Sequence, residues 1–231
     1  MQSATHPLTT TESTGSGPSS APIHPIPGFE NWKLSTVHPR GTVLFREGQI
    51  PKGVYLLRSG SIKLTTSSRR GKTLILRIAR AGEVLGLNSV LGRRAHDATA
   101  ETLEDCRAEF ISCAEFLKLL ADRQVADHVL QLLLHDADEM TQTTRILLLS
   151  DSAAEKLAGL LLKWSRDHGI ELPQGIRVNN RWTHEEISQI ICTSRETVTR
   201  LLGDFARREL IQLCGNSIVI KDLKGLESIG R

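Results

Sequence analysis

Short apolar runs separated by turn residues fill the chain between residues 41 and 112. Four segments carry this pattern and favour strands, namely GTVLFREGQ (41–49), GVYLLRSGSIKLTT (53–66), TLILRIARAGEVLG (73–86) and ATAETLEDCRAEFIS (98–112). Turn residues interrupt the runs at Gly60, at Arg70-Gly71 and at Ala81-Gly82. Strands at such even spacing predict an antiparallel β-barrel or jelly roll.

After the predicted strands, the apolar residues recur at helical spacing. Helical spacing begins near Cys113 and continues from about Asp122 to Leu149. The apolar positions in this segment are Val125, Val129, Leu132, Leu133, Met140, Ile146 and Leu149. Such a helix is longer than one small domain needs, so its stripe predicts pairing with a second copy of the chain. Packing of the stripe across the chain's own barrel is the alternative.

The last third of the chain has the element order of a winged helix. Ser150 or Asp151 is expected to cap a helix that stops at Gly169. A turn around Pro173 leads to two short helices within Trp182–Ile211. The segment QLCGNSIVIKD then predicts a hairpin whose turn contains Gly215-Asn216.

Two capping boxes mark the expected helix starts in this unit. Thr183 with Glu186 opens the first helix, and Thr193 with Glu196 opens the second. The second helix separates its residues by face, because its apolar residues recur at i, i+3, i+4 and i+7. These are Val198, Leu201, Leu202 and Phe205.

The polar face of the second helix suits the edges of base pairs in a DNA major groove. Arginine forks match the acceptors of guanine, and a carboxylate can accept from cytosine N4. The candidate base contacts are Arg195, Glu196, Thr199 and Arg200. The candidate phosphate contacts are Thr183, Ser194 and Thr197. The alternative is an ordinary solvated face, with Glu196 acting only as a cap.

These patterns divide the chain into four parts of an α+β protein. Residues 1–27 are rich in Ser, Thr, Pro and Gly and are expected to be disordered. Residues 28–121 form the barrel, residues 122–149 the dimerisation helix, and residues 150–231 the winged helix-turn-helix domain.

The charge, the apolar runs and the cysteines of the chain limit its possible partners and cellular location. The net charge of +3 is too small to argue for nucleic acid by itself. Between residues 40 and 94, however, twelve Lys or Arg face two acids, which indicates either solvated rims or an anion-binding or partner surface. Without a membrane-length apolar run or a signal-peptide core, the protein is expected to be cytoplasmic. The four cysteines form no CxxC pair and are expected to be isolated, buried thiols.

The segment QIICTSRETVTRLL (189–202) resembles the recognition motif of the Crp/Fnr superfamily of bacterial transcription regulators. The resemblance spans roughly residues 30–225 and implies a homodimer on a palindromic site with TGTGA-like halves. It places Arg195, Glu196 and Arg200 at the family's base-reading positions. Cys192 stands in the turn where the family often has Gly, which predicts backbone strain. Contact with RNA polymerase is also implied.

The segment GEVLG (82–86) and the surrounding strands resemble the family's cyclic-nucleotide-binding barrel. Leu87 replaces the glutamate that would bind ribose, and Leu has no acceptor for a hydroxyl. Allowing one deletion, the family's Arg–Ser pair falls on His96 and Asp97, and Asp97 would repel a phosphate. Cyclic AMP is therefore not expected, and the effector is left unknown. The candidate effector-binding residues are Gly86, His96, Asp97, Thr141 and Gln142.

The sequence also bears on other cofactors and on other classes of function. An iron–sulfur cluster is not expected, because the first cysteine is Cys106 and such clusters need several thiolates. Haem stays open, with His96, His128 and His135 as candidate ligands. A regulatory module acting mainly through protein contacts is the alternative function. No enzyme is expected, since no catalytic motif is present and HEE (184–186) lacks the second His of a zinc site.

Overall fold

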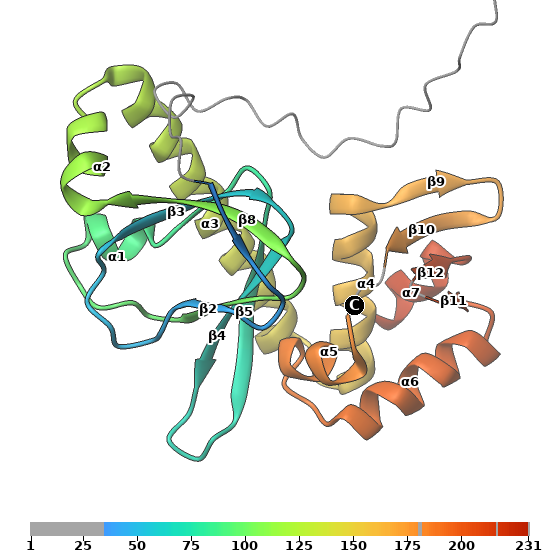
Figure 1. The fold of residues 1–231 in the computed structure, drawn as a ribbon. Helices are drawn as coiled ribbons and strands as arrows, with labels where there is room; N and C mark the ends of the chain where they lie inside the picture. Colours follow the sequence, from blue (N-terminus) through green and yellow to red (C-terminus); the bar gives the residue numbers. More distant parts are fainter. Residues whose placement is uncertain (1–34, 180–181, 216, 231) are drawn as a thin grey trace, which may run out of the picture.

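The computed structural model describes residues 35–179, 182–215 and 217–230. The predicted disordered tail, residues 1–27, lies outside them. Two halves are visible in Figure 1, with the long helix α3 (Arg123–Leu149) running behind the N-terminal strands and leading to the C-terminal helices. The predicted α+β class is confirmed.

The N-terminal half contains two four-stranded antiparallel sheets. The first has the order β1 (Ser35–His38), β8 (Cys106–Ser112), β3 (Gly53–Ser59), β6 (Val84–Leu85). The second has the order β2 (Val43–Phe45), β7 (Thr99–Thr102), β4 (Ser61–Ser67), β5 (Thr73–Arg80). All four predicted strand regions are confirmed, but the described strands form two sheets of a jelly roll rather than one closed barrel.

Side chains alternate across β3 and separate two cores. Leu57 lies between the sheets, in one cluster with Phe45 and Ile62. Val54 and Leu56 face the opposite way, toward three helices. These helices are α1 (Leu87–Leu91), α2 (Cys113–Leu119) and α3. The sequence did not predict β1 or α1, because both are too short for their period to register.

The apolar stripe predicted on α3 is divided in the structure. Val125 and Val129 are buried against the chain's own sheet, so the prediction of a partner copy over them is wrong. A different row of α3 is uncovered, since Leu130, Leu134 and Leu148 are 56%, 58% and 76% exposed.

The C-terminal half begins with α4 (Ala153–His168). Its cap is Ser152, whose Oγ accepts from the amide of Glu155 at 3.1 Å, so the predicted cap at Ser150 or Asp151 is wrong. Asp151 instead donates its amide to the Glu155 carboxylate at 2.8 Å, which ties it to the same first turn. Gly169 ends the helix as predicted.

A four-stranded antiparallel sheet completes this half, in the order β11, β12, β10, β9. Its strands are β9 (Ile170–Leu172), β10 (Gly175–Asn179), β11 (Ile211–Cys214) and β12 (Ser217–Ile220). The hairpin predicted around Gly215 is confirmed as β11–β12. The turn predicted at Pro173 proves to be the tip of a second hairpin, β9–β10. A final helix, α7 (Leu223–Ile229), packs on α4 and was not predicted.

Strand β5 connects the two halves. A bulge opposite Leu64 and Thr65 leaves Leu76 without a partner in β4. The bulge reverses the alternation of side chains, so Ile75 and Ile78 both face the C-terminal half. Ile75 is 1% exposed and shares a hydrophobic cluster with Leu160 and Ile190. The helix-turn-helix unit is thus packed directly on a strand of the N-terminal half.

Candidate nucleic-acid interface and sensor cleft

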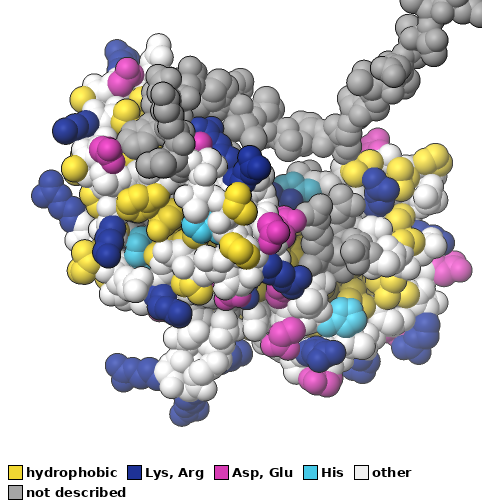
Figure 2. Space-filling view, in the orientation of Figure 1, with side chains coloured by type: hydrophobic (Ala, Val, Ile, Leu, Met, Phe, Trp, Pro, Cys, Tyr) yellow, Lys and Arg dark blue, Asp and Glu magenta, His cyan; other side chains and the backbone are white. Residues whose placement is uncertain are grey.

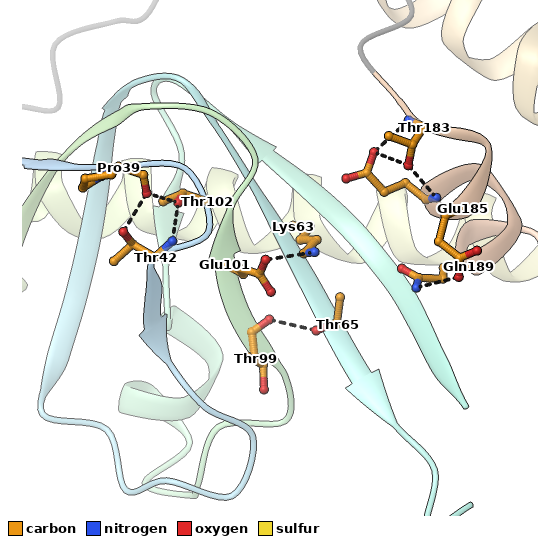
Figure 3. Close-up of polar contacts among 11 residues, drawn as sticks. Pro39, Thr42, Lys63, Thr65, Thr99, Glu101, Thr102, Thr183, Glu185 and Gln189 are labelled. Carbon is orange, nitrogen blue, oxygen red and sulfur yellow. Dashed lines mark hydrogen bonds and ion pairs between the residues drawn. The ribbon is translucent and has the colours of Figure 1, made fainter. Parts of the chain in front are cut away.

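Helix α5 (His184–Ile190) starts with the predicted capping box. The Thr183 hydroxyl accepts from the Glu186 amide at 3.1 Å, and the Thr183 amide donates to the Glu186 carboxylate at 2.8 Å. The Glu186 side chain is buried in this arrangement. Figure 3 shows this cap, together with the bond from Gln189 to Glu185 in the next turn of α5. The first helix is therefore fixed at its N-terminus.

The turn between the two helices contains Cys192, whose φ is +55°. This is the left-handed region that favours glycine, so the predicted backbone strain at Cys192 is present. The amide of Thr193 donates to the Ser188 carbonyl at 3.0 Å and fixes the turn.

Helix α6 (Arg195–Arg207) is capped by Ser194, whose hydroxyl accepts from the Thr197 amide at 3.2 Å. The predicted capping box of Thr193 with Glu196 is therefore wrong by one residue. Thr193 has the Glu three residues later that a capping box needs, whereas Ser194 has Thr197 at that position, so the sequence pattern favours Thr193.

The two faces of α6 separate as predicted. The apolar residues Val198, Leu201, Leu202 and Phe205 are buried. The four candidate base contacts, Arg195, Glu196, Thr199 and Arg200, are all exposed. Among the described residues, neither Arg195 nor Arg200 has an ion-pair partner. Both guanidinium groups are therefore available to a ligand outside the chain.

Two candidates on this face make local bonds. Hydrogen bonds from its own backbone amide and from Ser194 hold the pKa of Glu196 below its usual range. Glu196 is thus a carboxylate at neutral pH and can only accept. The Thr199 hydroxyl donates to the Arg195 carbonyl at 3.0 Å and lies 2.8 Å from Nδ1 of His184. No sequence pattern predicts this contact with His184.

The candidate phosphate contacts lie at the two helix starts. Thr183 and Ser194 are exposed caps, and Thr197 is half-buried with its hydroxyl 3.1 Å from that of Ser194. Helix N-termini carry unpaired amides and a partial positive charge, which suits an anion. The structure therefore places these three hydroxyls at the N-terminal ends of α5 and α6.

The candidate effector residues are only partly brought together. Gly86 caps α1 with a φ of +87°, and a Cβ there would lie 3.4 Å from the His96 ring. Asp97 is exposed and pairs with Arg94 at 3.2 Å. Thr141 and Gln142 lie on an exposed side of α3, and the Thr141 hydroxyl bonds the carbonyl of Ala137.

A cleft of about 420 Å³ lies beside His96. It is lined by Leu44, Phe45, Gln49, Ile50, Lys52, Gly53, Tyr55, His96 and Phe110. Tyr55 and Phe110 are cross-strand partners whose rings lie 5.0 Å apart. Because Val54 and Ile111, their neighbours in the strands, face the helices, the cleft lies across the sheet from α3.

His96 is the buried polar group of the cleft. Its ring stacks on Phe45 at 3.9 Å, and its Nδ1 lies 3.1 Å from the Ser89 hydroxyl. Burial lowers the pKa of His96, an effect that the nearby Asp97 opposes. The ring is therefore neutral at pH 7 and could bond a ligand through its other nitrogen. Sequence reasoning found His96 but missed the aromatic lining, because its rings come from strands far apart in sequence.

The remaining candidate ligands are scattered. His128 is half-buried and His135 is exposed on α3. Of the cysteines, Cys106 is buried, but Cys214 is exposed, so the prediction of buried thiols is wrong there. Within the described part of the chain, no cluster of three or more His, Cys, Asp or Glu is placed to hold a metal ion.

Two families match consecutive parts of the chain. Residues 36–123 match the cyclic nucleotide-binding domain, and residues 155–229 match the Crp-like helix-turn-helix domain. These matches cover the two halves that α3 connects.

Relatives and solved structures match most of the chain. The chain is 30% identical to the Global nitrogen regulator of Synechococcus elongatus over 186 residues, covering 78% of this chain and 82% of the relative. It is 29% identical to the CRP-like cAMP-activated global transcriptional regulator of Mycobacterium tuberculosis over 189 residues, covering 81% and 84%. The fold is similar to a CooA mutant from Carboxydothermus hydrogenoformans, with a TM-score of 0.74 at 20% identity over 86% of this chain and 88% of the other. No described helix combines the length and the apolar character needed to cross a bilayer.

Proposed function

This chain belongs to the Crp/Fnr family of transcription regulators, and we propose that it reads a specific DNA sequence by laying α6 in the major groove. The observation that carries the proposal is the state of the α6 polar face. Arg195 and Arg200 are exposed without an ion-pair partner among the described residues, and the Glu196 carboxylate is ionised between them. The opposite face is anchored in the core, which gives a groove-reading helix a fixed position.

The chemistry of the three residues supports a TGTGA-like half-site. Arg195 and Arg200 can each bond O6 and N7 of a guanine, while Glu196 can accept from a cytosine N4. Thr199 has its hydroxyl engaged by His184 and by a backbone carbonyl, so its methyl group is the part offered to a base. Thr183, Ser194 and Thr197 would hold the phosphates on either side.

The exposed row of α3 supports a homodimer. Positions 130, 134, 137, 141, 144 and 148 are all exposed and alternate spacings of four and three residues, as a coiled-coil seam does. Leu130, Leu134 and Leu148 would supply its apolar contacts. Pairing two copies along α3 would present two α6 helices, which must lie about 34 Å apart to enter successive major grooves.

The sensor half would bind an effector other than cyclic AMP. Leu87 and Asp97 remain unsuited to a ribose and a cyclic phosphate, although one relative is described as activated by that nucleotide. The aromatic cleft beside His96 is the proposed effector site. Haem remains a second candidate, since His96 is buried in that cleft with one ring nitrogen unengaged by the described residues.

A regulator of this kind would act in the cytoplasm and contact RNA polymerase. The deciding experiment is titration of labelled duplexes carrying two TGTGA halves, against scrambled halves of the same composition. Tighter binding to the palindrome supports the proposal. Equal binding to both would favour a module that acts mainly through protein contacts. An absorption spectrum of the purified protein, read for a Soret band, tests haem.

A further inference from the structure

The hairpin between β4 and β5 carries a group of exposed cations. Arg69, Arg70 and Lys72 lie at its tip, and none of them makes an ion pair with a described residue. Next to the tip, the Glu47 carboxylate accepts from the Thr66 hydroxyl at 2.9 Å and from the Ser67 amide at 3.2 Å. The tip is therefore a local excess of positive charge.

The tip is ordered by its own hydrogen bonds. The Ser68 amide donates to the Lys72 carbonyl at 2.9 Å, and the Gly71 amide donates to the Ser68 carbonyl at 2.9 Å. The Lys72 amide also donates to the Ser68 hydroxyl at 3.1 Å. Gly71 supplies the φ of +78° that this turn needs. The cations are thus presented on a formed turn.

The hairpin is also fixed relative to the helix-turn-helix unit. Ile75, three residues beyond Lys72, is buried in the core of the C-terminal half, and β5 packs against α5. Figure 1 shows the hairpin extending past the sheet toward the same edge of the molecule as α6. Figure 2 shows Lys and Arg side chains on both projections along this edge.

We propose that the β4–β5 hairpin is a second DNA contact, in which Arg69, Arg70 and Lys72 bind backbone phosphates outside the half-site read by α6. Guanidinium and ammonium groups bind phosphates through charge-assisted hydrogen bonds. A phosphate contact carries no information about the base, so this contact contributes affinity without sequence preference. The inference rests on the proposed DNA-binding function and extends it to the flanking duplex.

The test uses the full chain and two duplexes. One holds only the two TGTGA halves, and the other adds about ten base pairs of random sequence at each end, roughly one helical turn. Dissociation constants are measured by fluorescence anisotropy over a range of salt concentrations. The variant is Arg69→Gln/Arg70→Gln. The matched control is Arg93→Gln/Arg107→Gln, which removes two exposed arginines elsewhere on the sensor half.

Wild-type protein should bind the longer duplex more tightly than the shorter one, and the hairpin variant should lose this gain. Because each phosphate contact contributes about 0.9 to the slope of log K against log[salt], the variant's slope should be shallower by about 2 per bound chain. The control variant should keep the tighter binding to the longer duplex and the wild-type slope of log K against log[salt]. The variant Arg69→Lys/Arg70→Lys, which keeps both positive charges, should also behave as the wild type does.

Equal slopes for wild type and hairpin variant would overturn the inference. So would unchanged DNA binding combined with lost activation in a purified transcription assay, because that result assigns the hairpin to an acidic protein surface. If the wild-type protein shows no preference for TGTGA halves, the proposed sequence-specific function fails. The slopes on random duplex then still decide the hairpin's role, because phosphates are common to every sequence.

Discussion

The ammonium of Lys163 on α4 lies 2.8 Å from the Glu139 carboxylate on α3, and the Lys163 side chain is only 7% exposed. The same ammonium contacts Asp167 at 2.6 Å, one turn further along α4. Close by, Arg77 on β5 pairs with Asp136 on α3 at 3.1 Å. Ionic contacts therefore join the sensor sheet, the long helix and the DNA-binding half at one junction.

Replacing Lys163 with Met should lower the free energy of unfolding by about 3 kcal/mol, because two carboxylates lose the cation that compensates their partial burial. The measurement is urea unfolding followed by circular dichroism. Arg123→Ala is the control, since the Arg123–Asp127 pair is exposed and its loss should cost less than about 1 kcal/mol. Equal effects of the two substitutions would show that the junction contacts contribute no more stability than an exposed ion pair.

Arg195→Ala should weaken binding to a TGTGA palindrome by about 1–3 kcal/mol and relax preference at one base pair per half-site. The measurement is a set of titrations in which each base pair is changed in turn. If the loss is the same on every sequence, Arg195 contacts a phosphate instead of a base.

Cys192→Gly should stabilise the protein by on the order of 1 kcal/mol, because glycine adopts a φ of +55° without the strain that a Cβ causes. Cys192→Val should have the opposite effect, since a branched Cβ is worse in this region. Thermal unfolding of the three proteins gives the order. A destabilised glycine variant would mean that packing of the thiol outweighs the strain.

Stability should fall as the pH drops below about 6.5, partly because of His96. Burial lowers the pKa of His96 from its ordinary value of 6.5, so the unfolded chain takes up the proton first. The contribution is fully present above pH 6.5 and is lost as the pH falls toward the pKa of the folded state. His96→Gln should flatten this part of the curve of unfolding free energy against pH. Burial also lowers the pKa values of His38 and His168, so a residual slope is expected in the variant.

Leu134→Glu should convert the proposed dimer to monomers, because it places a charge in the exposed seam of α3 without touching the core. Light scattering after gel filtration gives the mass of each protein. The control is Leu117→Glu, a substitution of another large exposed apolar residue, on α2. A wild-type protein that is monomeric at micromolar concentration would contradict the proposal that two chains pair along α3.

The sequence predicted best where one short segment holds the whole signal. The amphipathic period of α6 and the Thr183–Glu186 cap are complete within a few residues, and both are present in the structure. The three-residue strand β9 is too short for alternation to show, so the β9–β10 hairpin was missed.

Features that depend on distant residues could not be predicted. Phe45, Tyr55 and Phe110 come from three strands and form one cleft only after the sheets pair. On α3, the helical spacing of the apolar residues predicted an apolar stripe. It could not show which residues of the stripe are buried by the rest of the same chain. Val125 and Val129 pack on the sheet, whereas Leu130 and Leu134 do not.

The bulge in β5 has a mechanical consequence. One face of this strand is part of the sensor's interior through Ala79, and the other is part of the DNA-binding core through Ile75. A C-terminal half expressed alone would therefore lack Ile75, and the apolar residues that pack against Ile75 would be exposed to water. Because β5 packs against α5, a ligand that displaces β5 would also displace α5.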